Sequence, residues 1–206
     1  MAITFPITLP TAQGFTRVTW GTRSAVAMFA SPFTGQQQIF QHPMQMLTVS
    51  IEMPPMKRDT ASVFLGALLS LQGTRGTFLF GDPAYPTPRG VGTGTPLIAG
   101  ASQTGTTLLT DGWTAAQTGI MRAGDWVQIG SGSTRQLCMV LVDANSDGSG
   151  AATLELFPRV RTAFADNTAL TVSSPLGVFR LAEDSSFVQD LGAITRGIVL
   201  NAMEAY

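Results

Sequence analysis

The chain has 206 residues, which suits one large domain or two small ones and is enough to bury a core without disulfide support. Cys138 is the only cysteine, so an intramolecular disulfide is excluded, and the net charge of −1 excludes a general basic field for nucleic acid. The opening MAITFPITLP lacks the pattern of a signal peptide, and no apolar run approaches the ~18 residues that span a bilayer, so we expect no membrane contact.

The chain is poor in charge. Asp, Glu, Lys and Arg make up 12% of the residues, against about 25% in an ordinary soluble domain, while apolar residues make up 44%. Lys57 is the only lysine among 12 basic residues, and arginine is enriched in protein interfaces where lysine is depleted. A GC-rich genome would give the same ratio of arginine to lysine. We interpret the low charge as a sign that partner proteins cover part of the surface.

The N-terminal part reads as a series of short β-strands. Residues 15–21 and 24–30 are rich in β-forming residues, and Gly21-Thr22-Arg23 between them predicts a hairpin turn. Residues 36–41 follow a turn-like SPFTG segment. The clearest strand is 46–53, where apolar and polar residues alternate with the period of a half-buried strand.

Residues 59–73 (DTASVFLGALLSLQG) predict the one helix. Asp59 or Thr60 is placed to cap its N-terminus, and apolar residues recur at helical spacing along one face. Phosphate-binding loops place their glycines before a helix, whereas Gly73, Gly76 and Gly81 follow this one, and no Gly-Lys-Ser/Thr comes after them. We therefore reject a nucleotide site and interpret the three glycines as structural turn residues.

A second unit is indicated between two breaks, the Pro- and Gly-rich residues 81–96 and the shorter SSPLG at 173–177. Short β segments at regular spacing between these breaks predict a small barrel or sandwich. The segments are 106–109, 125–130, 135–142, 152–157 and 169–172. Strand patterns return at 177–182 and 195–205. We predict a mainly β protein with one helix, in which a host domain of residues 1–84 plus 176–206 carries an inserted β-barrel of residues 85–175.

No pattern indicates catalysis. The only histidine, His42, precedes a proline and reads as a turn or edge residue, and Cys138 lies in an apolar strand where we expect it buried and inert. Residues 143–148 (DANSDG) match the opening of a calcium loop, but the twelfth position holds Leu154 where that loop needs a glutamate. We read this segment as an Asx-rich hairpin turn. We predict that the protein is no enzyme and has no cofactor and no metal site.

Three short stretches and the order of the elements resemble the distal tail proteins of long-tailed (siphovirus-type) bacteriophages and of gene transfer agents. The first stretch is the helix with the glycines and phenylalanines that follow it, up to Pro83. The second comprises GDWVQIG, TRQLCMVLV and ATLELFPRVR, and the third is the closing GIVLNAMEAY. Together they cover most of the chain after residue 59.

The resemblance implies a β-sandwich host domain with one helix and an inserted barrel of the oligonucleotide/oligosaccharide-binding type. It further implies a homo-hexameric ring, assembled head-to-tail at the distal end of the tail, that joins the tail tube protein to the tip hub protein. The tape measure protein is a further candidate partner, while specific nucleic-acid binding and membrane contact are not implied. The location would be the tail tip of the virion, and the host cytoplasm during assembly.

An alternative is a virion-attached carbohydrate-binding module that contacts the host surface. Trp113 or Trp126 would then stack on sugar rings and would have to be exposed. A ring-forming role alone predicts that both tryptophans are buried. The exposure of these two side chains therefore separates the hypotheses.

Ring contacts are expected in the host domain. Residues 25–33 and 53–56 are rich in Ala, Phe and Met and nearly free of charge, which is typical of the centre of an interface. Arginines close to these segments could bind carboxylates or carbonyls of the next subunit. The interface candidates are Phe29, Phe33, Met53, Met56, Arg17, Arg23 and Arg75.

Overall fold

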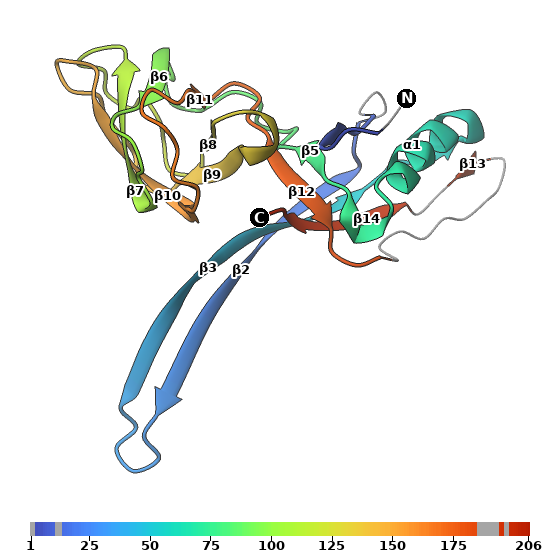
Figure 1. Cartoon of the computed structure of the whole chain (residues 1–206), viewed down its shortest axis with the longest axis horizontal. Helices are drawn as coiled ribbons and strands as arrows, with labels where there is room; N and C mark the ends of the chain where they lie inside the picture. Colours follow the sequence, from blue (N-terminus) through green and yellow to red (C-terminus); the bar gives the residue numbers. More distant parts are fainter. Residues whose placement is uncertain (1–2, 11–13, 185–193, 196–197) are drawn as a thin grey trace.

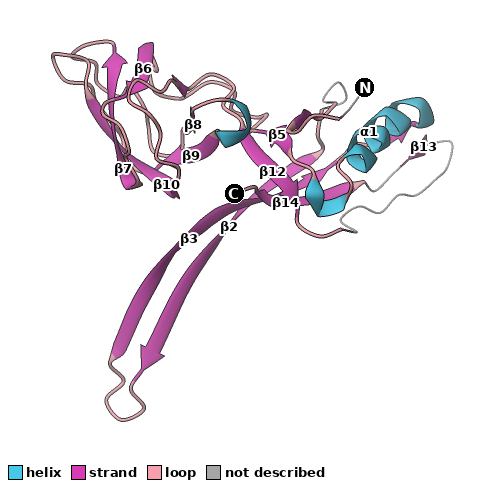
Figure 2. Cartoon of the chain, in the orientation of Figure 1, coloured by secondary structure: helices cyan, strands magenta, loops and turns pink. Residues whose placement is uncertain are grey.

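The computed structural model describes residues 3–10, 14–184, 194–195 and 198–206. The chain is mainly β, with one α-helix, as the sequence predicts (Figure 2). Two six-stranded sheets make up most of the molecule, the helix lies at the far end from the second sheet, and a long two-stranded arm leaves the body (Figure 1).

The first sheet combines strands from both ends of the sequence. Its order is β1 (Ile7–Thr8), β5 (Phe78–Phe80), β12 (Gly177–Leu181), β14 (Val199–Glu204), β3 (Gln37–Glu52) and β2 (Arg17–Ala30). The pair β1 and β5 is parallel and the other pairs are antiparallel. A separate two-stranded sheet pairs β4 (Met56–Lys57) with β13 (Ile194–Thr195).

The first sheet curls, so that the side chains of its two ends meet. Phe15 lies just before β2 at one end, and its ring centroid is 5.5 Å from that of Phe80 in β5 near the other end. Trp20 of β2 also contacts Phe80 and Phe179, at 5.9 Å in each case. These aromatic contacts cover one side of the first core.

The helix α1 (Arg58–Ser70) closes the other side of this core. Ala61, Phe64 and Leu68 are buried at helical spacing, which explains why this segment folds as an amphipathic helix. Lys57 occupies the N-cap position without a side-chain hydrogen bond, so the predicted cap by Asp59 or Thr60 is wrong. Acidic Asp59 still lies in the first turn, where the helix dipole favours a negative charge.

The second sheet is nearly closed into a barrel. Its order is β11 (Leu170–Thr171), β8 (Trp126–Ile129), β9 (Gln136–Val140), β10 (Ala152–Val160), β7 (Gly105–Trp113) and β6 (Gly94–Ile98). A bridge between Leu97 and Ala169 brings the two ends of the sheet together. Its interior is a second core that includes Ile129, Cys138 and Leu154. The sequence predicted all of these strands except β6, because Gly94 and Pro96 mask it.

The two sheets also pack against each other. Trp126 and Leu137 of the second sheet belong to the first core, and the ring centroids of Trp126 and Trp20 are 4.8 Å apart. Where the chain passes between the sheets, a Cβ on Gly81 would lie only 2.1 Å from the carbonyl oxygen of Pro175. Only glycine fits there, because any side chain would collide with the backbone. That residues 85–175 form a separate inserted domain remains a prediction. The two cores are in contact, because side chains of the second sheet pack in the first core.

The N-terminal strands differ most from the sequence prediction. Residues 15–21 and 24–30 were expected as separate strands with a turn at Gly21, whereas β2 is continuous from Arg17 to Ala30. Gly21 pairs with Thr48, and a hypothetical Cβ would meet that threonine's Oγ1 at 2.6 Å, so this glycine serves close packing between strands. The turn lies at SPFTG, where Ser31 Oγ accepts hydrogen bonds from the amides of Phe33 and Thr34.

Candidate interaction surface

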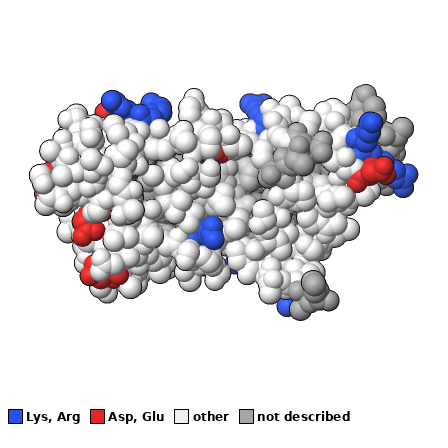
Figure 3. Space-filling model, turned by 90° about the horizontal axis from the view of Figure 1, so that it is seen from above, with Lys and Arg blue, Asp and Glu red and all other residues white. Residues whose placement is uncertain are grey.

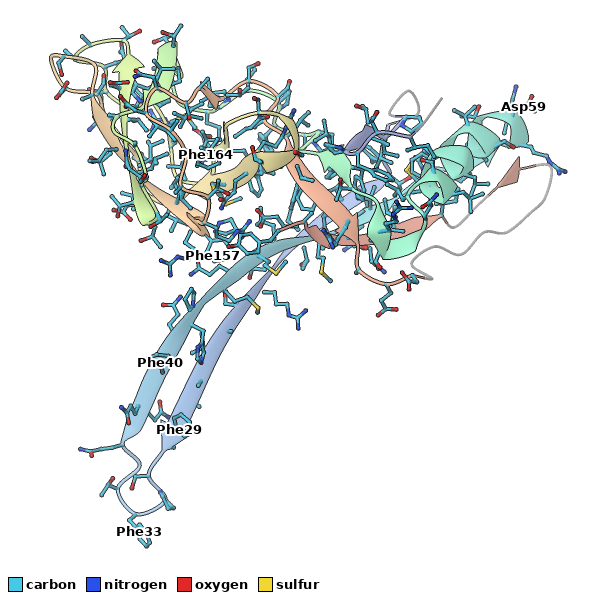
Figure 4. The ribbon with its side chains drawn as sticks, in the orientation of Figure 1. Phe29, Phe33, Phe40, Asp59, Phe157 and Phe164 are labelled. Carbon is cyan, nitrogen blue, oxygen red and sulfur yellow. The ribbon has the colours of Figure 1, made fainter. Side chains whose placement is uncertain are left out.

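The most distinctive surface is the outer part of the β2–β3 hairpin, residues 24–44, which we call the arm. It extends away from both sheets and ends in the turn that carries Phe33 (Figure 4). Ten residues of extended strand separate Trp20 in the body from Ala30 at the outer end of β2, a length of about 33 Å at ~3.3 Å per residue. The hairpin therefore carries the turn with Phe33 well beyond both cores.

The arm carries many of the exposed large apolar side chains of the described chain. Phe29, Phe33 and Phe40 are 68%, 95% and 59% exposed. Val26, Met28 and Ile39 are also more than half exposed. No Asp, Glu, Lys or Arg occurs between Arg23 and Glu52. Contiguous apolar surface of this kind is rare on monomers and marks sites of protein or membrane contact.

Strand register divides the arm into two apolar faces. Met28 pairs with Ile39, so these two aliphatic side chains share one face. Phe40 pairs with Ala27 and lies on the other face, and its ring meets His42 edge-on at 4.9 Å. The only histidine is thus an exposed strand residue beside an aromatic ring. A turn or edge position was expected for it: the turn is wrong, and the edge position is confirmed, because in the described chain this part of β3 pairs with β2 alone.

The predicted interface residues separate into three groups. Phe29 and Phe33 lie together on the arm. Met53 and Met56 are only 6% and 5% exposed and pack in the first core, so their expected place on the surface is wrong. Alternation along the end of β3 turns Met53 inward, and Met56 packs under α1. The three arginines Arg17, Arg23 and Arg75 are exposed.

These arginines do not form one cluster with the arm. Arg17 and Arg23 belong to β2, at its start and just before the arm. Arg75 lies in the 3-10 turn after the helix, where its Nη1 donates to Gln72 Oε1. Figure 3 shows how sparsely charged side chains occur on the face seen from above. The exposed apolar arm and not the arginines is therefore the feature on which an interface can be built.

Gly73 and Gly76, which the sequence predicts as turn residues, allow the tightly packed backbone path that follows the helix. Gly73 has φ +71°, and a Cβ there would meet the Asp184 carboxylate at 2.7 Å. Asp184 accepts a hydrogen bond of 2.9 Å from the amide of Thr74, and this bond lowers the pKa of the Asp184 carboxyl. A Cβ on Gly76 would meet the backbone of Leu71 at 2.6 Å. These contacts give the glycines a structural role without a ligand.

A buried ion pair joins the two sheets at the base of the arm. Arg161, directly after β10, donates through Nη2 to Glu204 in β14, and through Nη1 to the carbonyl oxygen of Gln45 at 2.6 Å. Glu204 also accepts a bond of 3.2 Å from the amide of Leu47. Burial raises the pKa of Glu204, and the bond and charge of Arg161 oppose that rise. This pair fixes the arm base relative to the second sheet.

Cys138 and the DANSDG segment, which were considered for chemistry, both have structural roles. Cys138 is fully buried, and burial raises the pKa of its thiol well above the usual range. Asp147 Oδ1 accepts hydrogen bonds from the amides of Ser149 and Ala151, so the DANSDG segment contains the expected Asx turn. Among the described residues no group of three or more His, Cys, Asp or Glu side chains is arranged to hold a metal ion. No helix of the described chain is long and apolar enough to cross a membrane.

Both candidate sugar-stacking tryptophans are buried. Trp113 and Trp126 are each 4% exposed. The indole Nε1 of Trp113 donates to Thr110 Oγ1 at 2.8 Å, and that of Trp126 donates to Asp82 at 3.2 Å. They are core residues with satisfied polar atoms, so neither offers a face to a sugar ring.

No protein-family model matches the sequence, and no match to it was found among curated proteins.

Proposed function

We propose that this chain is a non-enzymatic structural protein of a phage-type tail tip. In this proposal it forms a hexameric ring at the distal end of the tail and joins the tail tube to the tip hub. The first sheet with its helix serves as the ring-forming sandwich domain, and the nearly closed second sheet serves as a peripheral barrel of the oligonucleotide/oligosaccharide-binding type. Its place of action is the virion tail tip, after assembly in the host cytoplasm.

The observation that carries this proposal is the arm. An isolated two-stranded ribbon is marginally stable in water, and a charge-free edge strand invites pairing with other chains. Phe29 and Phe33 would be covered once the protein joins an assembly. The low charge of the whole chain agrees with a surface that neighbours hide. These features favour an assembly component over an enzyme or a free binding protein.

The carbohydrate-binding alternative loses its predicted platform. It requires an exposed Trp113 or Trp126, and both side chains are buried. A sugar-binding role would therefore need a different surface of the second sheet. The ring proposal needs no rearrangement of either tryptophan.

The deciding experiment is to locate the protein in assembled particles by electron microscopy. We expect six copies around the tail axis, between the tube and the tip. A position in the head, or a tail-tip copy number incompatible with sixfold symmetry, would contradict the proposal. Particles that lack the protein should have tubes without a joined hub.

A further inference from the structure

A groove lies on the body of the molecule where the two ends of the first sheet approach each other. It has a volume of about 810 Å³ and is lined largely by apolar side chains. Its wall includes Phe15, Trp20, Leu79, Tyr85 and Pro175. β1 and β2 are the edge strands of the described sheet, so the groove lies beside its two outermost strands. Pockets of roughly 300–1,000 Å³ enclose most of a drug-sized molecule, which is enough for several large side chains.

We propose that the arm of one copy of this chain binds in the groove of a second copy, with Phe29 and Phe33 as its anchoring side chains. This inference deepens the proposed ring, on which it rests for its biological setting.

The arm cannot reach the groove of its own chain. Trp20 lines the groove and belongs to the same continuous strand as Phe29. Nine residues of extended strand hold the two about 30 Å apart. Figure 1 shows the arm directed away from the body, so any arm–groove contact must form between two molecules.

The chemistry of the two surfaces matches. The arm has no charged side chain, and the groove wall has only Arg17 and Asp82 among its lining residues. When either surface is buried against an apolar partner, few charged groups lose their contact with water. The contact therefore carries little desolvation cost, which favours it. A highly charged partner would leave unpaired groups at both surfaces. A second copy of the chain offers an apolar groove to the arm and an apolar arm to the groove.

The area is sufficient for a specific interface. With exposures of 68%, 95% and 59%, the rings of Phe29, Phe33 and Phe40 present about 440 Å² at ~200 Å² per aromatic side chain. A standard interface takes about 800 Å² from each partner, so these three residues supply more than half of one side. Met28 and Ile39 lie on the other face of the arm, so they add to the contact only where the second copy encloses both faces.

The contact is head-to-tail, because the arm and the groove are different surfaces of one chain. Such heterologous contacts repeat from copy to copy and must either close into a ring or continue as a filament. The separation of about 30 Å between Trp20 and Phe29 sets the reach of the arm into the next copy. A closed ring built this way uses every arm and every groove once.

Cysteine crosslinking tests the contact directly. Cys138 is fully buried and leaves the background free of reactive thiols. Thr34→Cys places an exposed thiol at the arm tip and leaves the anchor Phe33 intact, and Tyr85→Cys places one at the groove, where Tyr85 is 61% exposed. The double variant should be oxidised at high protein concentration, with a sulfate salt present to strengthen apolar association. We expect it to give a ladder of covalent multimers. A mixture of the two single variants should give covalent dimers only.

A matched control uses the outer face of the helix. Leu69 is 66% exposed on α1, close to the 61% of Tyr85, so Thr34→Cys combined with Leu69→Cys offers a matched second thiol without the proposed contact. This pair should remain largely monomeric. Without cysteines, Phe29→Gln should weaken self-association measured by sedimentation by roughly tenfold or more, as expected for an aromatic anchor, whereas Leu69→Gln should leave it unchanged.

Several results would overturn the inference. They are the absence of arm–groove crosslinks under these conditions, equal crosslinking of the control pair, and dimers formed by Thr34→Cys alone, which would show tip-to-tip contact. Arm-dependent binding to lipid vesicles without crosslinks would assign the arm to a membrane instead. A sixfold ring in particles without these crosslinks would leave the proposed function standing, whereas crosslinks in a protein located in the head would retain the contact and refute the function.

Discussion

Replacing Arg161 with methionine should destabilise the fold strongly. The substitution keeps an apolar stem but removes the guanidinium that binds Glu204 and the carbonyl oxygen of Gln45. Glu204 is 2% exposed and would keep only the 3.2 Å bond from the amide of Leu47. Removing one partner of a buried ion pair costs about 3–5 kcal/mol, a large part of the ~5–15 kcal/mol that holds a typical domain together.

The loss should depend on pH. In the native protein burial already raises the pKa of Glu204, so stability falls as the pH rises from the unfolded-state pKa through the folded-state value. Arg161→Met raises the folded-state pKa further, because the neighbouring positive charge is gone. Below about pH 4 the carboxyl is protonated in both states and the substitution costs least. At pH values above the raised folded-state pKa, the Glu204 carboxyl is charged and the substitution has its full destabilising effect.

Urea unfolding followed by tryptophan fluorescence measures this, because the rings of Trp20 and Trp126 are in contact at the junction of the two sheets. The free energy of unfolding should be compared at about pH 4 and pH 8 for the native chain, Arg161→Met and the double variant Arg161→Met/Glu204→Gln. The double variant should recover most of the loss at high pH, since no buried charge remains unpaired. A loss below about 1 kcal/mol at pH 8, or an equal loss at both pH values, would refute the reasoning.

Three further predictions concern single sites. The thiol of Cys138 should not react with a thiol reagent until the protein unfolds, and rapid labelling of the folded chain would show that the second core is open. Asp125→Ala should lower the free energy of unfolding by about 2–4 kcal/mol in urea titrations, because the buried carboxylate accepts bonds from the amides of Arg89, Gly90 and Arg122. Calcium should leave the Tm unchanged in calorimetry, because Asp147 is engaged in its own turn, and a dose-dependent rise would indicate a calcium site.

The sequence predicted the elements whose signals are local. Helical spacing indicated 59–73, and the helix is Arg58–Ser70. Strict alternation before Met53 indicated the buried end of β3, and the continuous apolar run around Cys138 indicated a central strand. In each case the pattern reports burial within a single chain.

The arm was missed for a physical reason. Gly21 reads as a turn residue, and Pro43 as a strand breaker, yet both lie within long strands. The ladder from Arg17 to Ala30 overrides these local preferences, with one irregularity between Ser24 and Val26. The apolar content of residues 25–33 and 53–56 led to the same interface prediction for both segments, because apolar content alone could not tell the exposed Phe29 from the buried Met53.

The continuity of β3 has a mechanical consequence. One strand runs unbroken from the arm turn into the first sheet, where Leu47, Val49 and Ile51 are anchored in the core. Tension on the arm pulls β2 and β3 together, so it is resisted in shear by the ladder between β3 and β14 and by the side chains of β3 that are buried in the core. A sideways push instead concentrates at the irregularity after Ser24, where a bulged ladder bends most easily. The arm would thus resist stretching along its length and would bend most easily at its base.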